Sequence, residues 1–88
     1  MNLNLYSIKD NKTGFMHPQV DMNHKSAIRN FELTLATVSG DTVMGFCPED
    51  FDLYYIGQFD NESGIVSALP TPEFIRSGSS HYHTESEV

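Results

Sequence analysis

A five-residue turn sequence occurs twice in this chain, and it limits the folds that the chain can adopt. The first copy is Asp10-Asn11-Lys12-Thr13-Gly14 and the second is Asp60-Asn61-Glu62-Ser63-Gly64. Asp and Asn side chains bond to backbone amides within a turn, and Gly supplies the positive φ that closes a type I turn with a bulge. Because an alternating run precedes each copy, the two turns predict hairpins within one sheet.

The second copy predicts a hairpin whose strands are Leu53–Phe59 and Ile65–Leu69. Alternation along the incoming strand places Leu53, Tyr55 and Phe59 on one face, with Tyr54, Ile56 and Gln58 on the other. Gly57 has no side chain to pack, so it predicts a bulge or a close backbone approach.

The first copy follows Leu3–Lys9, a predicted strand. The segment Phe15–Val20 comes next, and it contains Pro18, which cannot donate to a ladder. We therefore expect this segment to be an edge strand or a loop.

The segment between the hairpins predicts a helix over residues 22–37. Asn23 can cap its start and Ser39-Gly40-Asp41 can end it. A strand is the alternative interpretation, because Phe31, Leu33 and Leu35 alternate with polar residues. A helix puts Leu33 opposite the core, as a candidate subunit contact. Its core stripe would comprise His24, Ala27, Ile28, Phe31 and Leu35.

These elements predict an α+β fold with a three- to four-stranded antiparallel sheet and one helix packed on a face. Cys47–Asp50 is a predicted turn, and Phe74-Ile75 a final apolar anchor. Residues 1–76 would form one domain, and residues 77–88 are polar and Ser-rich, which predicts a flexible tail. A core this small in an 88-residue chain favours a homodimer or a higher homo-oligomer.

The composition narrows the possible functions. Cys47 is the single cysteine, and the sequence contains no phosphate loop, dinucleotide fingerprint or G-x-S-x-G elbow. We therefore expect no enzyme, no catalytic residue, no cofactor and no small-molecule substrate. His81-x-His83 is at best half a metal site, so no metal is expected. The lack of a long apolar run or a basic leader predicts no membrane contact and a cytoplasmic location.

Charge is polarised within a net −7: residues 1–30 hold four of the five Lys and Arg side chains and two acids, and residues 31–88 hold ten acids. A basic face is therefore possible in an acidic protein. Cations near exposed aromatic rings on a sheet would bind single-stranded nucleic acid. The alternative is that the tyrosines line the core and the cations are solvated. The candidate nucleic-acid contacts are Lys9, Lys12, Lys25 and Arg29 for phosphates, with Tyr6 and Tyr55 for bases.

Three segments carry a family resemblance. They are Leu5-Tyr6-Ser7-Ile8-Lys9-Asp10, Ala27-Ile28-Arg29-Asn30-Phe31 and, above all, Pro48–Asp60, which reads PEDFDLYYIGQFD. Together with Ser63-Gly64 they resemble the small nonstructural protein of gokushoviruses, single-stranded DNA phages of the Microviridae. The resemblance implies a non-enzymatic accessory analogous to protein C of related phages, which helps the switch from duplex replication to single-strand synthesis and packaging.

Two functions follow as expectations. The first is a phage accessory in DNA replication and packaging, acting in the host bacterial cytoplasm on single-stranded DNA or on replication proteins. The second is an acidic protein-interaction module, either a DNA mimic or anti-defence factor or an adaptor that docks on a host or viral enzyme. Its candidate residues are Glu49, Asp50, Asp52, Asp60 and Glu62.

Overall fold

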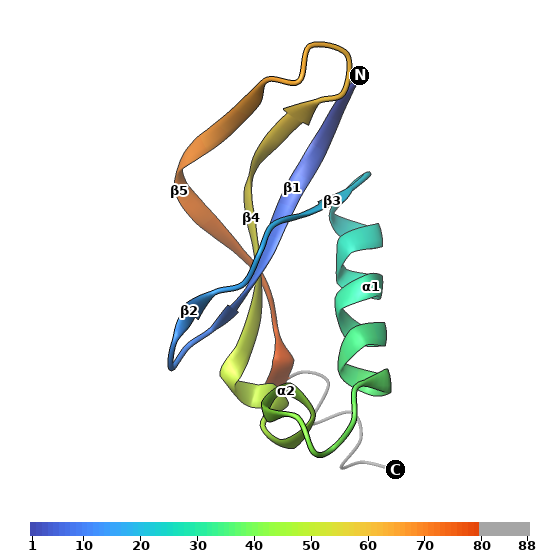
Figure 1. Ribbon diagram of the computed structural model, residues 1–88, viewed down its shortest axis with the longest axis vertical. Helices are drawn as coiled ribbons and strands as arrows, with labels where there is room; N and C mark the ends of the chain where they lie inside the picture. Colours follow the sequence, from blue (N-terminus) through green and yellow to red (C-terminus); the bar gives the residue numbers. More distant parts are fainter. Residues whose placement is uncertain (80–88) are drawn as a thin grey trace.

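The computed structural model describes residues 1–79 as an elongated α+β structure (Figure 1). Two long strands, β1 (Asn2–Asp10) and β4 (Phe51–Asp60), form the centre of an antiparallel sheet. β5 (Val66–Ser77) pairs with β4 on one side. On the other side, β2 (Gly14–Phe15) and β3 (Gln19–Asp21) pair with β1 one after the other.

The sheet contains five strands, one more than the upper limit expected from the sequence. The extra strand arises because Phe15–Val20 is divided at Met16–Pro18 into the two short strands β2 and β3, both at the sheet edge. The edge position of this segment is confirmed, and Pro18 lies in the interruption, where no ladder bond is required of it.

The predicted helix is confirmed as α1 (His24–Thr37). Asn23 caps it, because its side-chain oxygen accepts a hydrogen bond of 2.8 Å from the Ser26 N–H. Ala27, Phe31 and Leu35 are buried against one face of the sheet, and Ile28 packs beside them. Leu33 is exposed, as expected for the opposite side of the helix.

The core lies between α1 and the lower half of β1 and β4 in Figure 1. Two short helical segments close its end: α2 (Val43–Phe46), which the sequence analysis missed, and a 3-10 turn at Pro48–Asp50. The turn predicted at Cys47–Asp50 leads into β4, where Phe51 and Leu53 are buried in the core. The buried apolar side chains are Tyr6, Ile8, Ala27, Phe31, Leu35, Met44, Phe51 and Leu53.

A bulge at Ile56 reverses which side chains of β4 face the helix. Tyr6 pairs with Tyr55, whereas Leu5 pairs with Gly57, so β4 has one extra residue here. Phe59, opposite Leu3, therefore lies on the face away from α1. The expectation that Phe59 shares a face with Leu53 and Tyr55 is wrong for this reason, although a bulge or close approach at Gly57 is confirmed.

β5 continues well past Leu69, where the predicted strand ends. It bows away from β4 between Ala68 and Glu73, and this segment contains Pro70 and Pro72 (Figure 1). Ile75 packs against the core, whereas Phe74 lies on the other face of the sheet. Gly78 is buried against Pro48 and Phe51. The rest of the predicted tail, residues 80–88, lies outside the described residues.

Candidate nucleic-acid interface

The sheet face opposite α1, here called the open face, carries mostly apolar side chains. Side chains alternate between the two faces of a strand, and directly paired residues share a face. Since Ile8 faces the helix, its neighbours Ser7 and Lys9 face away from it. The same reasoning from the strand registers gives the residues of the open face: Leu3, Leu5, Ser7, Lys9, Phe15, Val20, Asp52, Tyr54, Gly57, Phe59, Val66, Ala68, Phe74 and Ser77.

Three aromatic rings form a row across this face, here called the aromatic row. The ring centroids of Phe15 and Tyr54 are 5.3 Å apart, and those of Tyr54 and Phe74 are 5.8 Å apart. Both contacts are edge-to-face, the arrangement that aromatic quadrupoles favour. Phe15 and Phe74 are 47% and 54% exposed, so the two ends of the row are open to a ligand.

Lys9 places a positive charge over the aromatic row. Its Nζ lies 5.5 Å from the Phe15 centroid and 5.9 Å from the Tyr54 centroid, within cation–π range. Among residues 1–79 it is in no ion pair within 4.0 Å. Asp52 is its cross-strand neighbour and weakens the local positive potential.

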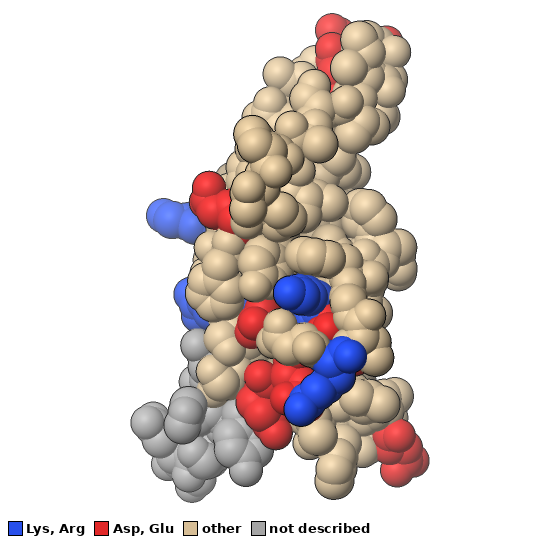
Figure 2. Space-filling model, turned by 90° about the vertical axis from the view of Figure 1, so that its left-hand side faces the viewer, with Lys and Arg blue, Asp and Glu red and all other residues tan. Residues whose placement is uncertain are grey.

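The four predicted phosphate contacts do not form one patch. Lys9 lies on the open face and Lys12 in the adjoining turn, whereas Lys25 and Arg29 lie on the side of α1 away from the sheet. These two pairs are therefore on opposite sides of the molecule. In Figure 2, which views the side with β2 and β5, blue and red groups are interleaved at the lower end. Convergence of the cations, as the sequence analysis expected, is not found.

The two tyrosines predicted to stack on bases are on the other face of the sheet. Tyr6 is only 2% exposed and belongs to the core, and Tyr55 is half-buried against it, with ring centroids 5.5 Å apart. Burial of its ring removes Tyr6 from the residues that a ligand can reach. The alternative, that strand tyrosines line the core, describes this pair correctly.

A hydrogen-bond network holds Tyr6 in place. Asn4 Nδ2 donates to the Tyr6 oxygen at 3.0 Å, and the Tyr6 hydroxyl shares a hydrogen bond of 2.6 Å with His24 Nδ1. His24 Nε2, on the other side of the ring, lies 3.9 Å from Glu73 Oε2. Desolvation raises the pKa of Tyr6, and the negative charge of Asp21 adds to the shift. The Tyr6 hydroxyl is thus a structural group that stays protonated.

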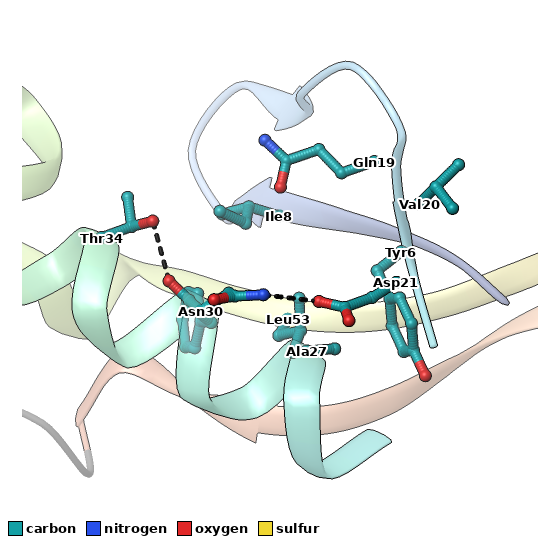
Figure 3. A pocket seen from close by; sticks show the side chains of 10 residues that line it. Tyr6, Ile8, Gln19, Val20, Asp21, Ala27, Asn30, Thr34 and Leu53 are labelled. Atoms are coloured by element: carbon teal, nitrogen blue, oxygen red, sulfur yellow. Dashed lines mark hydrogen bonds between the residues drawn. The ribbon is translucent and has the colours of Figure 1, made fainter. Parts of the chain in front are cut away.

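The cavity between α1, β1 and β3 is too small to be a substrate site. It measures about 20 Å³, which is room for one water molecule. Figure 3 shows Asp21 at its wall, where a carboxylate oxygen accepts a hydrogen bond of 2.8 Å from Asn30 Nδ2. Desolvation opposes ionisation of Asp21, but hydrogen bonds from Asn30, Ser26 and Met22 and the charge of Arg29 lower its pKa overall.

The remaining polar candidates are dispersed. Among residues 1–79 no three His, Cys, Asp or Glu side chains come together as a metal site, and His81 and His83 lie outside the described residues. Desolvation and the carboxylates of Glu49 and Asp50 raise the pKa of the Cys47 thiol, so it is protonated at neutral pH. The five acids of the second hypothesis fall into two groups: Glu49, Asp50 and Asp52 near the end of β1, and Asp60 with Glu62 at the opposite tip.

The aromatic row could not be predicted from the sequence because its members come from three strands. Tyr54 carried a signal, since it alternates with the core residues Phe51, Leu53 and Tyr55 and must therefore face away from them. Phe15 and Phe74 carried no such signal. The placement of Phe15 depends on the β1–β2 pairing, and that of Phe74 depends on an extra residue in β5, Ile75.

A family model described as phage ORF5 protein matches residues 3–81, which is most of the chain. This chain belongs to the phage ORF5 protein family. It is therefore a bacteriophage protein, and this confirms the part of the sequence resemblance that pointed to a phage. No curated protein and no solved structure matches the chain. Neither α1 nor any other helix within residues 1–79 has the length and apolar character needed to cross a membrane.

Proposed function

We propose that this member of the phage ORF5 family is a non-enzymatic accessory protein of a gokushovirus-like phage. It would act in the host cytoplasm, at the step from duplex replication to single-strand synthesis and packaging, as protein C does in related phages. The observation that carries the proposal is the aromatic row with Lys9 above it. Rings exposed on a sheet next to a cation are the usual means of binding single-stranded nucleic acid without reading its sequence.

In this proposal the contact depends on stacking more than on charge. Stacking contributes about 1–3 kcal/mol per base, and every base presents a face to a ring. Charge contributes little, because Lys9 is the cation on the open face and Asp52 is next to it. For single strands the slope of log K against log salt is about −0.7 per phosphate neutralised. Binding through Lys9 therefore gives a slope of about −0.7, against about −2.8 for a four-cation patch.

Fluorescence anisotropy of a labelled oligonucleotide of mixed sequence tests the proposal. Phe74→Leu keeps the apolar surface but removes a ring, and it should raise Kd about 5- to 150-fold, the equivalent of one stacked base. Phe46→Leu is the matched control, since Phe46 is an exposed ring on α2, away from the row. Lys9→Gln should flatten the salt slope, whereas Lys25→Ala with Arg29→Ala should leave it unchanged. Equal effects of the two Phe variants, or no binding at low salt, would reject the proposal.

One observation favours a second candidate function, the acidic protein-interaction module. Asp10, Glu49, Asp50 and Asp52 lie around the end of β1, where the Asn11 N–H donates to the Asp50 carbonyl and Asn11 Nδ2 donates to Asp52. This function is supported instead if the protein does not bind DNA and binds a replication enzyme. The double variant Glu49→Gln with Asp50→Asn should then lose binding to that enzyme.

A further inference from the structure

We propose that a second copy of this chain covers the open face when no DNA is bound. The two sheets would pack face to face about a two-fold axis, with the strands of one copy antiparallel to those of the other. The dimer itself does not depend on the proposed function and is tested without DNA.

Half of the sheet lacks a packing layer. Above the end of α1 in Figure 1 the strands continue alone, and polar residues there point to the helix side: Asn2, Asn4, Gln58 and Ser67. The residues on the open face at the same level are Leu3, Leu5, Phe59 and Val66. Polar and apolar residues alternate in this way along the strands of an antiparallel sheet that has one face in water and the other face packed. At this end, therefore, the face built for packing is the one away from α1.

The open face is large enough for a weak dimer interface. Nine residues of β1 and a width of four strands give roughly 30 Å by 19 Å, on the order of 570 Å² per copy. Stable interfaces bury about 600–1,000 Å² per partner, so this face falls just below the range of a stable dimer and fits a weak one. A reversible dimer that forms at micromolar concentrations is the expected consequence.

The middle of the open face is free of charged groups. Figure 2 shows a long uncharged surface between acids at the tip and mixed charges below. At the lower end Lys9 lies beside Asp52, so neither sign of charge dominates there. A two-fold axis at the middle of β1 would therefore bring the uncharged part of one copy onto that of the other, as in an isologous interface.

The dimer would also regulate the site of the proposed function. The aromatic row lies within the covered area, so self-association and DNA binding exclude each other. This consequence rests on the proposed function, whereas the dimer does not.

Sedimentation equilibrium of the full chain without DNA is the test. We expect reversible association from 9.9 kDa toward twice that mass as concentration rises. Val66→Glu would bury an unpaired charge in the interface and should raise the dimer Kd at least about 30-fold. Its matched control is Ser67→Glu, the next residue on the same exposed strand but on the other face, which should leave Kd unchanged. Val20→Glu and Gln19→Glu form a second such pair on β3.

Two outcomes would overturn the inference: a monomer at all concentrations, or equal weakening by both members of each variant pair. Thermal unfolding of the four variants checks that each remains folded. If the protein stays monomeric and binds the oligonucleotide, the dimer is wrong and the proposed function stands. If the protein dimerises as expected and does not bind DNA, the dimer stands and the proposed function is wrong.

Discussion

The hydroxyl of Tyr6 lies 2.6 Å from Nδ1 of His24 and so joins the middle of β1 to the first residue of α1. The contact explains why an aromatic residue with a polar end is buried at this point of the sheet. The ring fills the core, and the hydroxyl bonds to the imidazole and to Asn4.

Removing this hydroxyl should destabilise the fold. Tyr6→Phe leaves the Asn4 amide and the His24 ring without their partner, and we expect a loss of about 1 kcal/mol in the free energy of unfolding. Urea denaturation measures it. Tyr55→Phe is the control, since its hydroxyl is in no hydrogen bond within residues 1–79, and its effect should be below about 0.5 kcal/mol. Equal losses would show that the hydroxyl of Tyr6 contributes nothing specific.

Gly57 should not tolerate a side chain. A Cβ at this position would collide with the carbonyl oxygen of Ser67 and come within 3.1 Å of the Ala68 Cα. Gly57→Ala should therefore cost about 1–3 kcal/mol, because the β4–β5 pairing must shift. Gly40→Ala is the matched control, with nothing within 4 Å of the added carbon. If urea denaturation gave the two variants the same stability, the close approach would be refuted.

The cap of α1 should contribute measurably to stability. Asn23→Ala removes the side-chain oxygen that accepts from the Ser26 N–H, and a loss of about 1 kcal/mol is expected. Asn23→Ser keeps a capping oxygen and should retain most of the stability. Chemical denaturation followed by circular dichroism compares the two variants, and an Asn23→Ser protein as unstable as Asn23→Ala would contradict the capping role.

Asp21 should make the stability depend on acid pH. Its pKa in the folded chain is below the ordinary value of 3.8, so its ionised form favours the folded state. This contribution is fully present above that value and is lost as the pH falls through the lowered pKa. Asp21→Asn should therefore be less stable than the parent at about pH 6, and the difference should narrow at about pH 3. Urea midpoints at the two pH values measure this, and a constant difference would assign the effect to packing.

Local sequence signals were sufficient for most of the fold. The two Asp-Asn turns, the Asn23 cap and the apolar stripe of α1 depend on neighbours in sequence, and each lies where the sequence analysis placed it. The pairing of Phe15–Val20 and the length of β5 depend on distant strands. Sequence reasoning consequently undercounted the strands and ended β5 at Leu69.

The candidate site was harder to predict for the same reason. The face that a strand residue occupies is fixed by its register, and one bulge at Ile56 moved Phe59 to the opposite face. Tyr6 and Tyr54 look alike in sequence, but Tyr6 aligns with core residues and Tyr54 does not. Whether the cations lie on one side of the molecule also depends on which face of the sheet α1 covers, and the sequence does not show this.

The two prolines in the bowed part of β5 have a consequence for aggregation. Pro70 and Pro72 have no N–H to offer, and the bow turns the outer margin of the sheet away from a straight line. Neither proline can donate a ladder hydrogen bond to another chain along this margin. The edge is thereby protected against the strand-by-strand pairing that leads to fibrils.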